Sequence, residues 1–246
     1  MLDGVIGIYY RECTVLKKKI VRVVLAAAIP PFLYLMAFGY GVGKEVSVEG
    51  VDYIVFLLPG LLAMSSMNYS YNIATEINIS RFYLKIFEEY LLAPNQRWQI
   101  ILGEVLYGMT KGMIPVFVVI IYSIVCGISL NYSFLFFLVL FFHLMAFALI
   151  GLIVALKMKN HRDLASMNSF IITPMMFLSG TLFPVNQMPL FIQAIAAVSP
   201  LTYSVDLIRS SLLATESFSF SSLAILLLLN IVLVFIANRI VQRVET

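Results

Sequence analysis

Long apolar runs dominate the chain, and most approach the ~20 residues that a helix needs to cross the hydrocarbon of a bilayer. Because backbone groups in lipid must be hydrogen-bonded within the segment, these runs predict helices. The pattern therefore predicts an all-α integral membrane protein with six transmembrane helices in one transmembrane domain, 1–246. The expected spans are 21–43, 53–75, 100–127, 134–156, 169–184 and 222–239.

The first twenty residues carry a different pattern. Their apolar side chains recur every three or four positions, which places them on one face of a helix, and Lys17, Lys18 and Lys19 follow. Segment 1–20 therefore predicts an amphipathic helix in the cytoplasmic interface, with an ordinary charged leader as the alternative. The residues of the apolar face are Leu2, Val5, Tyr9, Cys13, Leu16 and Ile20.

Two of the expected spans contain polar groups. Span 53–75 becomes rich in Ser, Asn and Tyr after residue 64, so it should face protein or a wet path rather than lipid. Span 100–127 places Glu104, Gly108 and Lys111 on one face. Charges in the membrane cost about 2.5–3.5 kcal/mol each, so they normally pair or line a cavity. A structural pair, snorkelling of Lys111 and a direct substrate role all remain open. Gly108 and Gly112 fit close helix packing.

Region 184–221 fits poorly as one straight crossing because it contains three prolines and several polar residues. Pro184, Pro189 and Pro200 divide it into short amphipathic pieces. Such pieces fit a re-entrant hairpin at the outer leaflet, where protein or water covers the backbone. We expect this hairpin between spans 5 and 6.

Segment 76–97 alternates charged with apolar residues at helical spacing. Arg81, Lys85, Glu88 and Glu89 form a charged face over an apolar one. Such a helix suits docking into a groove on a soluble partner, and a helix lying on the membrane surface is the alternative.

Composition and charge agree with the membrane class. The chain is 61% hydrophobic and 12% charged, against roughly 25% charged in soluble domains. Its sixteen basic residues are unevenly placed: five lie in the N-terminal segment, three in 76–99, three in 157–168 and two at the C-terminus. The positive-inside rule puts these four regions, and both termini, in the cytoplasm of a multi-pass plasma-membrane protein.

No motif for catalysis, cofactor binding or metal binding is present in the sequence. The nearest approach to a P-loop, Gly39–Glu45, has Phe38 where the first glycine belongs and Glu45 where a Ser or Thr would bind Mg²⁺. His143 and His161 lack metal-ligand spacing with any cysteine or acid. If the protein is ATP-driven, another chain must supply the ATPase. We expect contact with membrane lipid and no nucleic-acid partner.

Soft, polarizable side chains gather in the second and fifth spans. They would suit an amphipathic or lipid-like cargo, and they are equally common in ordinary helix packing. The candidates for lining a path are Met64, Met67, Tyr69, Tyr71, Met176 and Phe177.

Two stretches resemble the ABC-2 type permeases, the membrane subunits of ATP-binding-cassette exporters. Residues 92–94 followed by 101–104 are similar to the end of the family's coupling segment and the start of its third helix. Residues 177–184, then 188–189 and 199–209, are similar to its C-terminal signature. The chain departs from relatives that often have a glycine where Lys85-Ile86-Phe87 stands here.

The resemblance implies a homodimer of six-helix subunits bound to two copies of a cytoplasmic ATPase. Cargo such as a lipo-oligosaccharide, a polysaccharide or a drug would pass along the dimer seam, lined by spans 2 and 5. The N-terminal helix and the coupling segment would contact the ATPase, and the re-entrant hairpin would form an outer gate. The gate residues implied are Phe183, Pro184, Pro189, Pro200, Tyr203 and Arg209.

Two other functions compete with this one. An ion-coupled secondary transporter could use Glu104 and Lys111 as titrating groups, although no internal repeat is apparent. A membrane enzyme or assembly factor would need acids or histidines clustered at one depth, which the sequence does not show.

Overall fold

The computed structural model describes residues 2–42, 47–48, 50–93, 96–158, 160–213 and 218–243, and helices make up most of them. Three features expected from the sequence lie partly outside these residues. They are the P-loop-like stretch at 43–46, the coupling segment at Pro94 and the basic region 157–168 at Lys159. The elements are α1 (Asp3–Tyr34), η1 (Leu35–Val42), β1 (Ser47–Val48), β2 (Val51–Asp52), α2 (Tyr53–Tyr71), α3 (Ile73–Phe82), α4 (Ile86–Leu92), α5 (Arg97–Val125), α6 (Phe134–Lys157), α7 (His161–Met167), η2 (Asn168–Ile172), α8 (Thr173–Leu178), η3 (Val185–Gln187), α9 (Leu190–Val198), α10 (Pro200–Leu213) and α11 (Phe220–Arg243).

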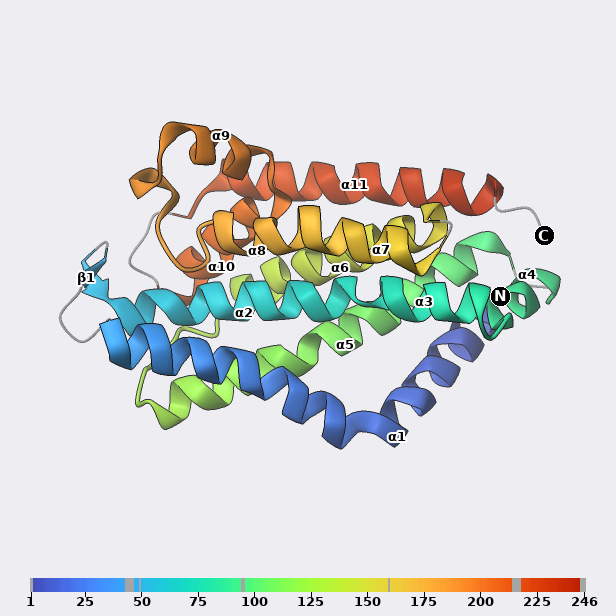
Figure 1. The fold of residues 1–246 in the computed structure, drawn as a ribbon, viewed down its shortest axis with the longest axis horizontal. Helices are drawn as coiled ribbons and strands as arrows, with labels where there is room; N and C mark the ends of the chain where they lie inside the picture. Colours follow the sequence, from blue (N-terminus) through green and yellow to red (C-terminus); the bar gives the residue numbers. More distant parts are fainter. Residues whose placement is uncertain are drawn as a thin grey trace.

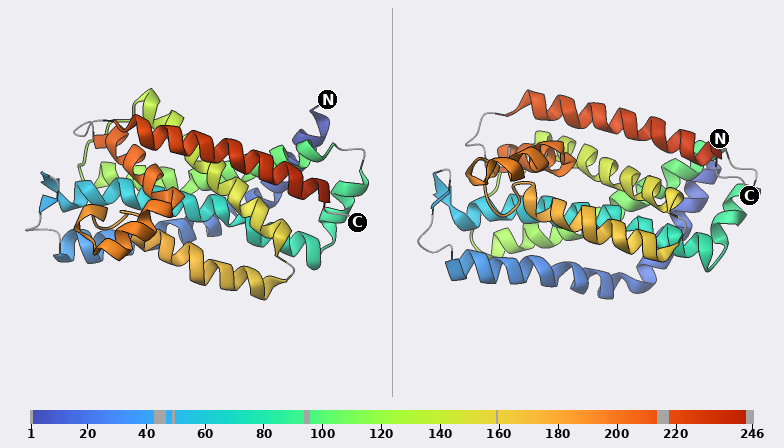
Figure 2. Two further views of the ribbon diagram at one scale, coloured as in Figure 1. Left: turned by 90° about the horizontal axis from the view of Figure 1, so that it is seen from above. Right: turned by 45° about the horizontal axis from the view of Figure 1, so that its top comes forward.

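The long helices run roughly along one axis, and the molecule has two distinct ends (Figure 1). The N-terminus, the C-terminus and α4 lie at one, which we call the termini end. The β1–β2 hairpin, α9 and α10 lie at the other, the hairpin end. Both further views show the same arrangement (Figure 2). In the hairpin itself, Ser47 pairs with Asp52 and Val48 with Val51.

Five helical segments in the described part are long and apolar enough to cross a membrane, and the bent pair α9 and α10, at 88°, could count as a sixth. This confirms the all-α membrane class. The five are Asp3–Gly39, Tyr53–Phe82, Arg97–Val125, Phe134–Lys157 and Phe220–Gln242.

The expected fifth span, 169–184, is not one of these five segments. Helix starts earlier there, at His161, and ends at Leu178. The polar opening of α7, with Arg162 and Asp163, lowers the mean hydropathy of this rod. The rod of α7, η2 and α8 nevertheless extends along the bundle from the termini end toward the hairpin end (Figure 1).

Helix α2 occupies the centre of the bundle and packs against α5, α6 and α10. In the apolar 18-residue stretch of its span, 78% of the residues are buried, against 17% in the corresponding stretch of the α1 span. Ser65, Ser66 and Ser70 are among the buried residues. The prediction that this polar span faces protein or a wet path rather than lipid is therefore confirmed.

Glycines allow the close approaches around α2. A Cβ added at Gly112 on α5 would lie 2.0 Å from Ser70 Oγ and 2.7 Å from Leu144 Cδ2, so α2, α5 and α6 approach closely here and a larger residue would displace these side chains. A Cβ added at Gly60 would lie 1.9 Å from the carbonyl oxygen of Thr181. The first contact confirms the close packing predicted at Gly112.

The predicted amphipathic segment is the beginning of α1, which continues without a break into the first span. Figure 1 shows these first turns, in dark blue, at an angle to the rest of the helix. Val5, Ile8 and Leu16 are buried, whereas Leu2 and Tyr10 are exposed. The buried face is thus rotated slightly from the expected one, and it packs against α5.

Candidate functional site

A groove of about 500 Å³ lies between α1 and α2, and we call it the α1–α2 groove. One wall is a polar stripe at steps of three or four residues along α2 and α3: Ser65, Asn68, Asn72 and Glu76. Such steps keep side chains on one helix face. The rest of the lining is mainly apolar and comes from α1, α2 and α8, and two basic residues, Arg22 and Lys111, also line the groove. The groove therefore offers hydrogen-bonding and charged groups beside apolar surface.

The six residues predicted to line a path have different positions. Met64, Tyr69 and Met176 line the groove. Met67 is fully buried elsewhere in the core. The Tyr71 hydroxyl donates a hydrogen bond to Asn168 Oδ1 at 2.7 Å. Phe177 meets the ring of Tyr34 edge-on, 6.5 Å away, beside the groove.

An ion pair stands at one end of the groove. Lys111 Nζ lies 3.1 Å from Glu76 Oε1, and the Lys111 side chain is only 6% exposed, against 41% for Glu76. The buried cation on α5 is therefore neutralised by a carboxylate from α3. This is the structural pair that the sequence left open as one role for Lys111.

A second cavity of about 130 Å³, the termini-end pocket, lies behind this ion pair. Glu12, Glu76 and Glu104 line it, together with Arg11 and Tyr107. Glu104 is only 3% exposed. Since Glu76 lines both cavities, the Glu76–Lys111 pair lies between the pocket and the groove.

Helix α4 is tied to the first helix by a polar cluster. Arg11 forms an ion pair with Glu12, and its Nη1 donates to the Tyr90 hydroxyl at 3.2 Å. The Tyr90 hydroxyl donates in turn to Glu12 Oε1 at 3.1 Å. Burial raises the pKa of Tyr90, and the Glu12 charge raises it further, so the hydroxyl keeps its proton. The predicted interface helix and the coupling segment are thus physically connected.

The charged residues of the coupling segment have separate environments. Arg81 Nη1 donates to the carbonyl oxygens of Ala155 and Leu156, at 2.8 and 3.1 Å, and so caps the end of α6. Lys85 and Glu89 are exposed. The Glu88 side chain lies outside the described part. Lys85 has a φ of 56°, a left-handed conformation that favours glycine.

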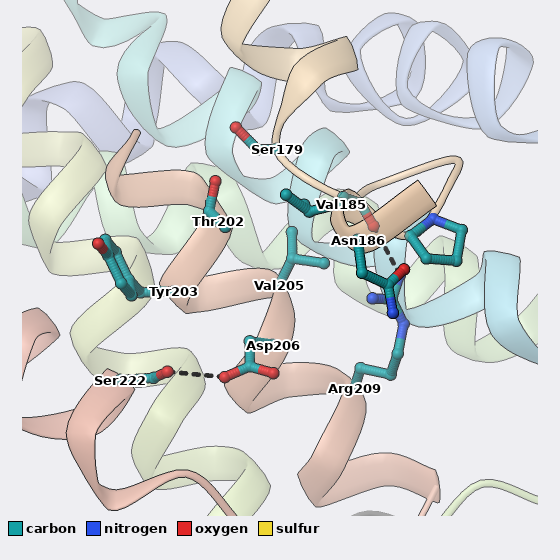
Figure 3. A pocket seen from close by; sticks show the side chains of 11 residues that line it. Ser179, Val185, Asn186, Thr202, Tyr203, Val205, Asp206, Arg209 and Ser222 are labelled. Atoms are coloured by element: carbon teal, nitrogen blue, oxygen red, sulfur yellow. Dashed lines mark hydrogen bonds between the residues drawn. The ribbon is translucent and has the colours of Figure 1, made fainter. Parts of the chain in front are cut away.

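At the hairpin end, a polar cavity of about 470 Å³ opens between α10 and the turn before α9 (Figure 3). Arg209 Nη2 donates to the Gly180 carbonyl oxygen at 2.8 Å, and the guanidinium lies 3.8 Å from the centroid of the Phe56 ring. Ser222 of α11 donates to Asp206 Oδ2 at 2.7 Å. Arg209 therefore fastens the turn at Gly180 to α10 and α2.

Three of the six implied gate residues, Pro184, Tyr203 and Arg209, line this cavity. Phe183 stacks with Tyr53, with centroids 6.3 Å apart. Pro189 and Pro200 mark the starts of α9 and α10, and Pro200 follows directly on the 88° bend. The structure gathers the six at one end of the molecule.

His143 and its neighbours form a packed polar site in the core. Its Nε2 lies 3.0 Å from Ser66 Oγ, and the ring meets Phe147 at 5.0 Å between centroids. Among the residues that the structure describes, no group of three or more His, Cys, Asp or Glu side chains could hold a metal ion.

Sequence reasoning missed Glu76 as the partner of Lys111 and Glu12 as the partner of Tyr90. A signal for Glu76 was available, because it continues the polar stripe of Asn68 and Asn72 at steps of four. Nothing in the sequence placed Glu12 beside α4, since the two segments are far apart along the chain.

Comparisons with known proteins match most of the chain. The family model described as ABC-2 type transporter matches residues 6–213. Nodulation protein J of Rhizobium leguminosarum bv. viciae is 30% identical over 211 residues, which are 85% of this chain and 82% of that protein. Nodulation protein J of Rhizobium meliloti (strain 1021) is 30% identical over 213 residues, 85% and 81% of the two chains. Inner membrane transport permease YadH of Escherichia coli (strain K12) is 28% identical over 195 residues, 76% of each chain.

Proposed function

The chain belongs to the ABC-2 type transporter family, and from that premise we propose that it moves an amphipathic or lipid-linked cargo out of the cytoplasm or the inner leaflet. Members of this family are transport subunits in the membrane, and a separate ABC subunit hydrolyses ATP. The cargo class proposed here covers a lipo-oligosaccharide, a polysaccharide or a drug. We further propose a homodimer bound to two ATPase copies, with both termini in the cytoplasm.

The lining of the α1–α2 groove is the observation that supports the proposed class of cargo. Its polar stripe of Asn68, Asn72 and Glu76 suits the head of an amphipathic molecule, and its Met64 and Met176 side chains suit the apolar part. Asn68 and Asn72 stand on one helix face within the membrane-spanning segment. Polar groups held there are costly unless they serve a wet or polar path.

The coupling role of segment 76–97 is supported by its surface. Tyr83, Leu84 and Leu92 are 58–77% exposed at the termini end, beside the exposed Lys85 and Glu89. Exposed apolar residues framed by charge are typical of a docking site. Tyr90, on the same short helix, connects this surface to α1, and the Glu12 that accepts its hydrogen bond lines the pocket next to the groove.

The first test is reconstitution with the ATPase subunit that co-purifies with the permease. Glu88→Ala combined with Glu89→Ala should abolish the stimulation of ATP hydrolysis, while membrane insertion stays normal. Asn186→Ala combined with Gln187→Ala, at the hairpin end, is the matched control and should leave stimulation intact. Normal transport by the Glu88/Glu89 variant would refute the docking role.

A second test addresses the groove. Asn68→Leu combined with Asn72→Leu should remove the stimulation of ATP hydrolysis by a lipid-linked oligosaccharide and leave the basal rate unchanged. Unchanged stimulation by the cargo would place the path elsewhere in the molecule.

One observation favours the second candidate function, an ion-coupled transporter. Glu104 is a buried acid beside a cavity, a position that in membrane transporters is often occupied by a titrating group. That function predicts gradient-driven uptake by the purified chain without any ATPase, abolished by Glu104→Gln. Uptake that depends on ATP and on the partner subunit would exclude it.

A further inference from the structure

The middle of α1 leaves the helix bundle between two buried residues. Leu16 and Ala27 are buried, and none of residues 17–26 is. Residues 17–22 are exposed without interruption, and they cover more than one turn of the helix. No described part of the chain therefore encloses this turn. In a membrane protein, lipid and its headgroups are the natural surroundings of such a turn.

One stripe of exposed side chains runs through this turn and continues along α1. Leu25 is 60% exposed, and Ile29 and Leu33 are each 57% exposed. Two exposed cations, Lys18 and Arg22, precede them on the same helix face, because all five residues follow one another at steps of three or four. We call this set the α1 stripe. It begins with two positive charges and continues as an open apolar surface.

The length of the helix places the two cations at the boundary of the hydrocarbon. Residues 23–42 are helical and contain no charged side chain. At about 1.5 Å per residue they span about 30 Å, the thickness of the hydrocarbon core of a bilayer. The β1–β2 hairpin follows at one boundary. Arg22 therefore stands at the other boundary, at the level of the phospholipid phosphates.

The charges near the stripe leave its cations in excess. Among the described residues, no ion pair involves Lys18 or Arg22. The two stand one helix turn apart, so they repel each other, and an anion between them would remove that repulsion. The carboxylates that line the two neighbouring cavities are matched by other cations. These matched groups are Glu12, Glu76 and Glu104 against Arg11, Lys19 and Lys111.

The chemistry of the stripe selects an anionic phospholipid. The arginine guanidinium binds two phosphate oxygens at once, and the lysine adds a point charge. A zwitterionic headgroup would bring a cation of its own beside these two, whereas a glycerol headgroup brings none. The apolar part of the stripe, about 12 Å long from Leu25 to Leu33, offers an acyl chain a surface to cover.

A second copy of the chain is the other candidate for this surface. In a two-fold dimer whose axis is normal to the membrane, equal residues lie at equal depth. Two α1 stripes packed on each other would therefore bring Lys18 and Arg22 against their own copies. Contact with an anionic lipid avoids this meeting of like charges.

We propose that the α1 stripe binds one anionic phospholipid, with the phosphate on Lys18 and Arg22 and an acyl chain along Leu25, Ile29 and Leu33. The lipid stabilises α1 where no described residue packs against it. Because Arg22 also lines the α1–α2 groove, the headgroup stands at the edge of that groove.

The test measures thermal unfolding of the purified permease in maltoside micelles. Dioctanoyl phosphatidylglycerol at about ten times its half-saturating concentration should raise Tm by about 3–6 °C. Dioctanoyl phosphatidylcholine, which has the same chains and no net charge, should raise Tm much less. An equal rise with both lipids would overturn the requirement for an anion, and no rise with phosphatidylglycerol would overturn the site.

Glycerol 3-phosphate distinguishes a lipid from a free phosphate. It carries the phosphate without acyl chains, so at the same concentration it should protect only weakly. Protection equal to that by phosphatidylglycerol would show that the apolar part of the stripe contributes nothing, and would overturn the assignment to a lipid.

Variants then locate the effect. Lys18→Gln combined with Arg22→Gln should raise the half-saturating concentration of phosphatidylglycerol about tenfold or more. Lys157→Gln combined with Arg162→Gln, which removes two other exposed cations, is the matched control and should leave it unchanged. If the first double variant does not fold, Arg22→Gln alone should weaken binding severalfold, and Arg22→Lys should restore part of it. Unchanged binding by Arg22→Gln would contradict the proposal.

The oligomeric state of the Lys18/Arg22 variant decides between lipid and a second copy. Light scattering should show the same state as in the unmodified permease. A changed oligomeric state together with unchanged lipid protection would assign the stripe to a second copy and overturn the lipid site. None of these readouts involves the ATPase or a cargo, so their failure leaves the transport function untouched.

Discussion

Lys85 adopts a backbone conformation that costs a lysine more than it would cost a glycine. Among the described residues it is the one non-glycine with a positive φ, 56°, and it stands in the short turn between α3 and α4. A left-handed conformation costs an L-residue about 1–2 kcal/mol, whereas glycine adopts it freely. A glycine at this position would relieve that cost, and only the structure identifies Lys85 as the residue of 85–87 that bears it.

Lys85→Gly should therefore stabilise the permease by about 0.5–1 kcal/mol, after allowance for the greater freedom of glycine in the unfolded chain. The matched control is Lys17→Gly on the exposed side of α1, which should lose about 1 kcal/mol. Thermal unfolding of the two purified variants measures both changes. Destabilisation by Lys85→Gly would show that this lysine makes a compensating contact.

The ion pair between Glu76 and Lys111 makes a second prediction at the scale of single residues. Because Lys111 is 6% exposed and Glu76 is 41% exposed, the two partners should respond unequally to loss of the other. Glu76→Gln strands a buried cation and should cost about 3 kcal/mol, in the range for broken buried pairs. Lys111→Met strands a carboxylate that water can reach and should cost less.

A double-mutant cycle in thermal or denaturant unfolding measures this coupling. The Glu76→Gln/Lys111→Met double variant should be more stable than Glu76→Gln alone, because the stranded charge is removed. Equal losses in the two single variants would mean that both sites are solvated alike.

The sequence placed Glu104 and Lys111 on one face of one helix, and this could not reveal their partners. Seven residues of helix separate them by about 10 Å along the axis, too far for a direct pair. Which neighbouring helix supplies a counter-charge depends on how α3, α5 and α1 pack. That packing follows from long-range contacts, such as Gly112 against Ser70, and not from periodicity within α5.

At the scale of elements, hydrophobic periodicity predicted most of the bundle. The polar character of α2 correctly placed that helix inside, because its serines are buried against neighbouring helices. The fifth span was misplaced for a definite reason: its helix begins with the polar residues His161–Asp163 and carries a π-helical turn at η2. A search for unbroken apolar runs therefore finds only its second half.

The link between α1 and α4 predicts local stability at this scale. Tyr90→Phe removes the hydrogen bond to Glu12 and should loosen α4 from α1 without unfolding the bundle. A hydrogen bond worth about 1 kcal/mol corresponds to roughly fivefold faster opening. Hydrogen exchange of the amides in 86–92 should accelerate by about that factor. Tyr83→Phe, an exposed tyrosine in the preceding turn, is the control and should leave exchange unchanged.

At the scale of the whole molecule, the distribution of basic residues and the arrangement of the helices indicate the same orientation in the membrane. The two termini and α4 share one end, and the basic clusters of the sequence fall in the segments that gather there (Figure 1). The hairpin end presents α9, α10 and the cavity around Arg209. An excess of lysine and arginine marks the cytoplasmic side of membrane proteins, so the termini end should lie in the cytoplasm and the hairpin end outside.

Cysteine labelling tests this orientation directly, because the chain has only two cysteines, Cys13 and Cys126, and both can be replaced by serine. A single cysteine at Asn186 should react with a membrane-impermeant maleimide in intact cells. A single cysteine at Glu89 should react only after the membrane is permeabilised. The opposite pattern would invert the molecule and place the proposed docking surface where no ATP is available. Labelling of both sites in intact cells would mean that the two ends do not lie on opposite sides of the membrane.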